Sequence, residues 1–257
     1  MERAECPRRR IAVVGIGAGD PRFVTVEALQ VLASLDVIIV FDKGDRAGEL
    51  RAVREAILDR ARAGRACRMI ELPDARRDDS LDYGDTVRTW HRGRADALEQ
   101  VLRDHVGDGE VAGILVWGDP SLYDSTLRIL DEVAGRGNTE LEVQVVPGVS
   151  SLHVLAARHG IPLHAIGGSV LITTGRRLRE GIPAGIDDVV VFLDANCSFM
   201  TLRGGDWEIY WGAFLGMPDE QLIVGRLDEV ATDIVQLRER LRAEHGWVFD
   251  CYLLRRR

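Results

Sequence analysis

Three glycine-rich loops, each following a short apolar run, are the places where this sequence could do chemistry. They span residues 15–20, 118–120 and 147–151. Glycine lets the backbone approach a ligand closely, and open parallel sheets bind their ligands at the carboxyl ends of the strands. The main-chain amides and carbonyls of these loops are therefore the predicted binding groups.

The first two loops each carry an aspartate, with different implications. The first loop contains Gly15, Gly17 and Gly19 followed by Asp20, whereas a dinucleotide-binding loop has the spacing G-x-G-x-x-G. Asp20 would place negative charge near a pyrophosphate, which argues against a nicotinamide enzyme. In the second loop a proline ends the strand, and Asp119 can hydrogen-bond amides of its own loop. A ligand site and a plain structural turn both fit this second pattern.

The elements that must position these loops alternate between strand and helix over the first half of the chain. Apolar runs predict buried strands, and apolar residues at helical spacing predict helices, the first capped by Thr25. Such alternation predicts a parallel sheet covered on both faces. The predicted strands are 11–14, 37–41, 69–72 and 111–117, and the predicted helices are 24–35, 50–61 and one from about 85 to 102.

Strands dominate the second half, which predicts a mixed sheet in a separate domain. We place the boundary in the loop that follows the strand 111–117, giving an N-terminal α/β domain over 9–121 and a C-terminal domain over 122–257. The predicted helices are 125–135, one ending near 159, and 229–244. The predicted strands are 141–146, 170–173, 189–193, 208–211, 222–224 and 247–253.

Composition argues against several classes of protein. The 257 residues carry a net charge of −8, and a nucleic-acid binder needs clustered positive charge. No apolar run approaches the roughly 20 residues of a membrane helix, and no signal-peptide pattern opens the chain. The four cysteines are scattered without a C-x-x-C pair, so we expect free thiols in a reducing cytoplasm and no metal site.

Four motifs in register resemble the tetrapyrrole methylase family, the class III S-adenosylmethionine-dependent methyltransferases. The family's opening VGxGPGD loop corresponds to residues 14–20, with Ala18 in place of the usual proline. Its GDPxxY motif corresponds to 118–123, its PGxSS motif to 147–151, and its Tyr-Asp pair to Phe41 and Asp42. The resemblance runs over essentially the whole chain.

The resemblance implies a fold, a cofactor and a reaction. It implies two α/β domains with the active site in the cleft between them, S-adenosylmethionine as methyl donor, S-adenosylhomocysteine as product, and usually a homodimer. The stretches 117–129, 173–181, 211–220 and 245–256 resemble the members that act in aerobic cobalamin biosynthesis. Those members methylate carbon 1 of precorrin-5 and release its acetyl group as acetate.

Carried over motif by motif, the resemblance also implies which residues contact the cofactor. Asp194 departs from the family pattern, because relatives often have a Tyr-Met pair at 193–194. The expected contacts are Trp117, Gly118, Asp119, Leu122, Ser150, Ser151, Leu193, Asp194, Gly212 and Ala213.

Removing an acetyl group requires a general acid and base within hydrogen-bond reach. The candidates are His91, Tyr123, Asp194 and Asp20, with Asp42 a further one. Each also has a plainer interpretation, as a surface histidine, a packing tyrosine or a turn aspartate. If Trp90 faces the core, His91 points about 100° away around the helix.

A polycarboxylate substrate requires local positive charge on an acidic protein. Arg176 and Arg177, with Arg179 beside them, directly follow a predicted strand, and Lys43 follows another. We expect Lys43, Arg176, Arg177 and Tyr123 to contact the substrate, although solvated surface charge is the alternative for the three basic residues.

Other functions remain open at this level. Within the family, the chain could methylate a different corrinoid carbon, or act on RNA or protein, of which RNA fits poorly with the net charge. Outside it, the alternatives are a nicotinamide-dependent oxidoreductase and a binding module without catalysis.

Overall fold

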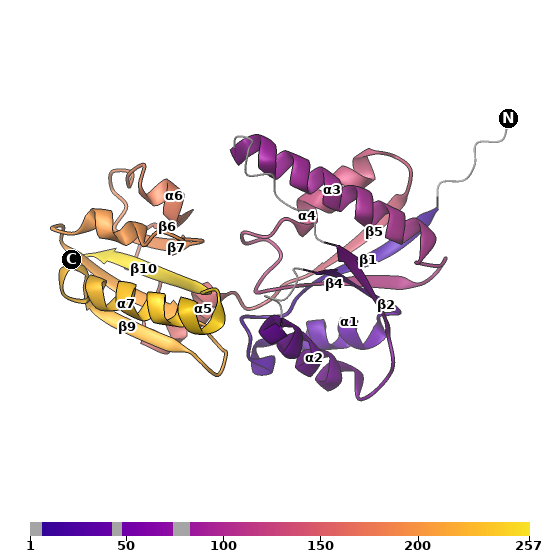
Figure 1. Ribbon diagram of the computed structural model, residues 1–257, viewed down its shortest axis with the longest axis horizontal. Helices are drawn as coiled ribbons and strands as arrows, with labels where there is room; N and C mark the ends of the chain where they lie inside the picture. The colour runs from indigo at the N-terminus through magenta and orange to yellow at the C-terminus, as the bar shows by residue number, and fades with distance from the viewer. Residues whose placement is uncertain (1–6, 43–47, 74–82) are drawn as a thin grey trace. The chain divides into compact units, whose positions relative to one another are not determined.

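The computed structural model describes residues 7–42, 48–73 and 83–257 (Figure 1). The chain divides into two compact units, Met1–Val149 and Ser150–Arg257. Each unit has its own five-stranded sheet. No helix in the described part of the chain is long and apolar enough to cross a membrane.

The sheet of the first unit is parallel throughout, as predicted. Its strand order is β3-β2-β4-β1-β5. The glycine-rich loops follow β1, β4 and β5, which are neighbours in this order, so all three loops leave the sheet at the same edge. The strands are β1 (Arg8–Gly15), β2 (Val37–Asp42), β3 (Arg68–Pro73), β4 (Val111–Val116) and β5 (Glu140–Val146).

Two helices cover each face of this sheet (Figure 1). Helices α1 (Val26–Ser34) and α2 (Gly48–Arg62) pack on one face, and α3 (Tyr83–Asp104) and α4 (Thr126–Gly135) pack on the other. Thr25 caps α1 as predicted, because its Oγ1 accepts the amide of Ala28 at 3.1 Å. A short 3-10 helix, Pro21–Phe23, precedes α1.

The sheet of the second unit is mixed, as predicted. Its order is β6-β7-β10-β8-β9, with β6 parallel to β7 and the other pairs antiparallel. The strands are β6 (Val170–Thr174), β7 (Asp188–Phe192), β8 (Trp207–Ala213), β9 (Gln221–Arg226) and β10 (Asp250–Arg256).

Helices cover both faces of the second sheet. Helix α7 (Leu227–His245), the short α6 (Gly175–Leu178) and the 3-10 helix η3 (Ser198–Leu202) share one core with Trp211 and Tyr252. Helix α5 (Ser151–His159) packs against β8 and β10 on the other face. The last strand begins later than predicted, because Trp247 stacks edge-on against Phe214 instead of joining the sheet.

The first unit extends beyond the expected boundary at 121/122. Strand β5 pairs with β1 from Glu140 to Val146, and α4 places Ile129, Leu130 and Val133 in the core of the first unit. The loop after β4 therefore lies inside the first unit, and the chain passes to the second unit only after Val149.

Candidate cofactor and substrate site

The three glycine-rich loops of the first unit meet backbone against backbone. A Cβ on Gly15 would lie 2.6 Å from the amide nitrogen of Gly148 and 2.8 Å from the carbonyl oxygen of Gly118. A Cβ on Gly148 would overlap that same carbonyl oxygen. Side chains are excluded from this junction, so close main-chain packing explains why glycine stands in all three motifs.

The first two loops are also joined by a pair of main-chain hydrogen bonds. The amide of Gly118 donates to the carbonyl of Gly17 at 2.8 Å, and the reverse bond is 3.3 Å long. Both glycines adopt the left-handed conformation, with φ of 79° and 68°. A residue with a Cβ would be strained at either position.

Asp119 links the second loop to the third. Its Oδ1 accepts the amide of Ser121 at 2.9 Å, which confirms the predicted hydrogen bond within its own loop. Its Oδ2 accepts the amide of Gly148 at 2.9 Å. Carboxylate–amide bonds of this kind are stronger than neutral ones, so this side chain fixes the relative position of the two loops.

Asp20, a predicted acid–base candidate, is engaged by its own neighbour. Its carboxylate accepts the amide of Arg22 at 2.8 Å, capping the 3-10 helix, and pairs with the Arg22 guanidinium at 2.6 Å. With both oxygens occupied, this geometry favours a structural role for Asp20 over proton transfer.

Strained residues mark the predicted binding loops. Five non-glycine residues of the described chain have positive φ, and three of them follow β4, β7 and β8: Tyr123 at 53°, Leu193 at 52° and Phe214 at 50°. Backbone strain of this kind concentrates at ligand sites. Tyr123 and Leu193 are also 41% and 63% exposed, so both are accessible to a ligand. Partial burial raises the pKa of Tyr123 above its ordinary value.

His91 lies beside the loop that follows β4. Its Nε2 is 3.0 Å from Oγ of Ser125, and its ring is half-buried. Trp90 is buried, so the condition for His91 to point away from the core is met. Of the acid–base candidates, His91 and Tyr123 are the pair that the structure associates with this one loop, residues 118–125.

Asp194 lies in the second unit as the centre of a buried network. Its carboxylate accepts Oη of Tyr252 at 2.6 Å, Oγ of Ser198 at 2.8 Å and two backbone amides of the following turn. Tyr252 has its pKa raised well above the ordinary value by burial and by this carboxylate. The network holds the turn after β7, so Asp194 fixes the backbone on which Leu193 is exposed.

The other predicted cofactor contacts differ in exposure. In the first unit, Trp117 and Leu122 are half-buried. In the second unit, Ser150 is buried, with Oγ 2.9 Å from Nδ1 of His153. Ser151 is half-buried and begins α5, whereas Gly212 and Ala213 are buried at the end of β8.

The predicted substrate cations are only partly described. Arg176 and Arg177 are exposed on α6, and Arg177 pairs with Glu180 at 2.5 Å. Arg179 is exposed just after this helix. Lys43 lies outside the described residues, as does the side chain of Asp42, whose backbone ends β2.

Two arginines that the sequence reasoning missed line a small pocket in the first unit. The pocket holds about 80 Å³ and lies where β2 and β4 end, lined by Phe41, Arg54, Arg94 and Trp117 among others. A charged residue within a helix's apolar face is the signal that could have found them. Arg54 is four residues after Leu50 on one predicted face, and Arg94 is four residues after Trp90 on another.

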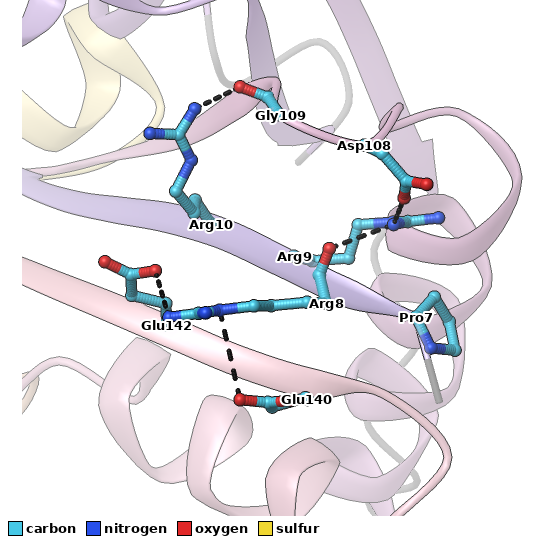
Figure 2. A pocket seen from close by; sticks show the side chains of 8 residues that line it. All are labelled: Pro7, Arg8, Arg9, Arg10, Asp108, Gly109, Glu140 and Glu142. Carbon is cyan, nitrogen blue, oxygen red and sulfur yellow. Dashed lines mark hydrogen bonds and ion pairs between the residues drawn. The ribbon is translucent and has the colours of Figure 1, made fainter. Parts of the chain in front are cut away.

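A larger hollow at the opposite end of the first sheet has a different character. Figure 2 shows its lining, which includes Arg8, Arg9 and Arg10 at the start of β1. Arg8 pairs with Glu142 at 2.9 Å, Arg9 pairs with Asp108 at 2.5 Å, and Arg10 donates to the carbonyl of Gly109. Its charges are internally balanced, and it lies away from the carboxyl ends where parallel sheets bind ligands.

The described residues form no cluster suited to binding a metal ion. No group of three or more His, Cys, Asp or Glu side chains there could hold an ion. Cys67, Cys197 and Cys251 are free thiols, as predicted, and Cys6 lies outside the described residues.

The chain belongs to the tetrapyrrole (corrin/porphyrin) methylases, whose family model matches residues 10–231. Within that family it is 41% identical to the precorrin-6A synthase (deacetylating) of Sinorhizobium sp. over 254 residues, covering 98% of this chain and 97% of the relative. A cobalamin-synthesis-related protein of Corynebacterium diphtheriae superposes with a TM-score of 0.83 at 35% identity, over 97% of this chain and 99% of that one.

A more distant structure shares the fold. The uroporphyrin-III C-methyltransferase of Thermus thermophilus, solved with S-adenosylhomocysteine, superposes with a TM-score of 0.57 at 19% identity. That superposition covers 95% of this chain and 96% of the other. The predicted α/β fold with one parallel and one mixed sheet is thereby confirmed.

Proposed function

We propose that this chain transfers a methyl group from S-adenosylmethionine to carbon 1 of precorrin-5 and releases the ring's acetyl group as acetate. The observation that carries the proposal is the 41% identity to a deacetylating precorrin-6A synthase over nearly the full length of both chains. The stretches 173–181 and 211–220, which resemble the members of aerobic cobalamin biosynthesis, fall within that alignment.

The residues present suit S-adenosylmethionine. When bound, this group supplies its sulfonium methyl and becomes S-adenosylhomocysteine. The three glycine-rich loops lie together at the carboxyl ends of β1, β4 and β5, where parallel sheets bind ligands. The chain's part is to orient the donor and exclude water. The proposed contacts are Trp117, Gly118, Asp119, Leu122, Ser150, Ser151, Leu193, Gly212 and Ala213, with Asp194 holding the turn that carries Leu193.

Acetate release adds a demand for proton transfer. Water attacks the acetyl carbonyl, the bond from that carbonyl to the ring carbon breaks, and the ring carbon takes up a proton. We assign the acid–base role to His91 and Tyr123. Their support is the hydrogen bond between His91 and Ser125, together with the strained backbone and the exposure of Tyr123 in the same loop.

The remaining parts of the proposal concern the substrate and the setting. Arg176, Arg177 and Lys43 would meet carboxylates of precorrin-5, since Arg is suited to planar carboxylate contacts. We also propose a homodimer that works in the cytoplasm, without a nucleic-acid or membrane partner.

Mass spectrometry of the product tests the proposal. The purified chain is incubated with precorrin-5 and S-adenosylmethionine carrying a labelled methyl group. The expected corrinoid gains the label and lacks the acetyl group. A labelled product that keeps the acetyl group would indicate a methylase for another corrinoid carbon. Calorimetric binding of NAD but not S-adenosylhomocysteine would instead favour the oxidoreductase.

A further inference from the structure

The pocket between the ends of β2 and β4 has the character of a site for one anionic group. It holds about 80 Å³, the space of two or three water molecules at about 30 Å³ each. A tetrapyrrole ring cannot enter such a space, whereas the end of a single substituent can. Its lining belongs entirely to the first unit, on the same edge of the sheet as the glycine junction.

Arg94 is held in this pocket by aromatic rings. It is only 8% exposed, and its guanidinium carbon lies 3.9 Å from the ring centroid of Trp90 and 4.4 Å from that of Phe41. Cation–π contacts of this kind fix the plane of a guanidinium. A planar guanidinium held in one orientation suits a planar carboxylate.

Arg54 is the second cation of the pocket, and no described residue balances its charge. It forms no hydrogen bond or ion pair with any other residue in the part of the chain that the structure describes. Burial lowers its pKa from the ordinary value, and burial is the one cause acting on it. Arg54 is half-buried, and a partly buried charge without a partner costs free energy unless a ligand supplies the counter-charge.

Among the described residues that line the pocket, Asp124 is the one with an acidic side chain. The charged side chains that line it are Arg54, Arg94 and Asp124. One oxygen of Asp124 accepts the amide of Thr126 at 2.7 Å, so it stays with its own turn. Because Asp124 is held by its own turn, the charge of Arg54 is the one in the pocket that no described residue matches.

We propose that Arg54 and Arg94 form a carboxylate-binding subsite. Resting on the proposed function, its ligand is either an acid side chain still attached to the tetrapyrrole or the acetate that the reaction releases. Both sources present the same chemistry to the pocket.

The test uses Arg54→Met and Arg54→Lys in the full-length protein, with Arg51→Met as the matched control. Arg51 is one turn earlier on α2, exposed, and paired with Glu55 at 3.0 Å. For each variant we would measure the KM for precorrin-5 and the dissociation constant of S-adenosylhomocysteine. If the carboxylate belongs to the ring, Arg54→Met should raise the KM about tenfold or more, as expected for loss of a hydrogen bond to a charged group. Arg54→Lys should fall between it and the wild type, and affinity for S-adenosylhomocysteine should stay unchanged.

Two further experiments complete the test. One distinguishes the two sources of the carboxylate, and the other tests the subsite if the proposed function fails. Competitive inhibition by sodium acetate that weakens in Arg54→Met would identify released acetate, and its absence alongside a raised KM would identify a side chain of the ring. If the wild type does not turn over precorrin-5, the proposed function fails on its own. The subsite is then tested by fluorescence titration with uroporphyrin III and with its uncharged methyl ester.

The results test the subsite whether or not the wild type turns over precorrin-5. Weaker binding of the acid form by Arg54→Met, but not by Arg51→Met, supports the subsite. A KM or dissociation constant within about twofold of the wild type for Arg54→Met, together with acetate inhibition that is absent or unchanged in that variant, overturns it, as does failure of the wild type to prefer uroporphyrin over its ester. Equal losses in Arg54→Met and Arg51→Met overturn it too, because general surface charge would then explain the effect.

Discussion

Oδ2 of Asp119 accepts the amide of Gly148 at 2.9 Å, which joins the loop after β4 to the loop after β5. The same carboxylate binds the amide of Ser121 through its other oxygen. An asparagine can accept at only one of these two places with its single carbonyl oxygen.

Asp119→Asn should therefore weaken both the fold and cofactor binding. We expect a loss of about 1–3 kcal/mol in the free energy of unfolding, measured by urea denaturation, and a weaker dissociation constant for S-adenosylhomocysteine. Asp131→Asn, at an exposed position on α4, serves as the control and should stay within about 0.5 kcal/mol of the wild type. Equal stability of the two variants would contradict the linking role.

Gly148→Ala tests the glycine junction directly. The added Cβ would overlap the carbonyl oxygen of Gly118, and because both groups belong to the backbone, relief requires a main-chain shift. We expect destabilisation of about 1–3 kcal/mol or more together with loss of S-adenosylhomocysteine binding in calorimetry.

The matched control for that substitution is Gly135→Ala. Gly135 ends α4, and a Cβ there meets nothing within 4 Å. Alanine should raise stability by up to about 1 kcal/mol, because it loses less chain entropy than glycine in a helix. A Gly148→Ala variant as stable as Gly135→Ala would show that the junction is not close-packed.

The parallel and mixed sheets could be predicted because their strands carry continuous apolar runs. The runs at 11–14 and 111–117 became β1 and β4, buried on both faces as adjacent parallel strands. The boundary could not be predicted in the same way. Whether β5 joined the first sheet or the second depends on its pairing with β1, and its own residues are largely exposed.

The parts of the candidate site that main-chain atoms form could be predicted from the sequence. The parts that side chains form could be predicted less well. The glycines of the three loops meet because their strands are neighbours. Asp194 could not be assigned, because one of its four hydrogen bonds comes from Tyr252, which is distant in sequence. Arg54 and Arg94 were missed because the helices containing them were interpreted through their apolar positions alone.

Tyr252→Phe separates an anchoring Asp194 from a catalytic one. Removing the buried hydroxyl should cost about 1–3 kcal/mol of unfolding free energy and leave the pH dependence of kcat unchanged. Tyr210→Phe removes a hydroxyl bonded to Glu208 at 2.8 Å in a half-buried setting, and should cost less. A kcat profile shifted by Tyr252→Phe, with stability intact, would assign Asp194 to proton transfer.

His159 predicts a pH dependence of stability. Burial lowers its pKa, partly offset by its bond to the carbonyl of Trp211. A group whose folded pKa lies below its unfolded value of about 6.5 stabilises the fold fully above that value. This contribution is lost as the pH falls through the folded pKa.

The measurement is the free energy of unfolding of wild type and His159→Gln at about pH 7.5 and about pH 5. The glutamine amide can still donate to Trp211 but does not titrate in this range. The wild type should lose more stability on acidification than the variant. Parallel losses in the two proteins would show that His159 titrates normally.

The central claim is that methylation and loss of the acetyl group belong to one reaction of this chain. The most direct test measures acetate and S-adenosylhomocysteine together during turnover of precorrin-5. The account predicts that the two appear in equal amounts throughout the time course. S-adenosylhomocysteine formed from precorrin-5 without acetate would contradict it.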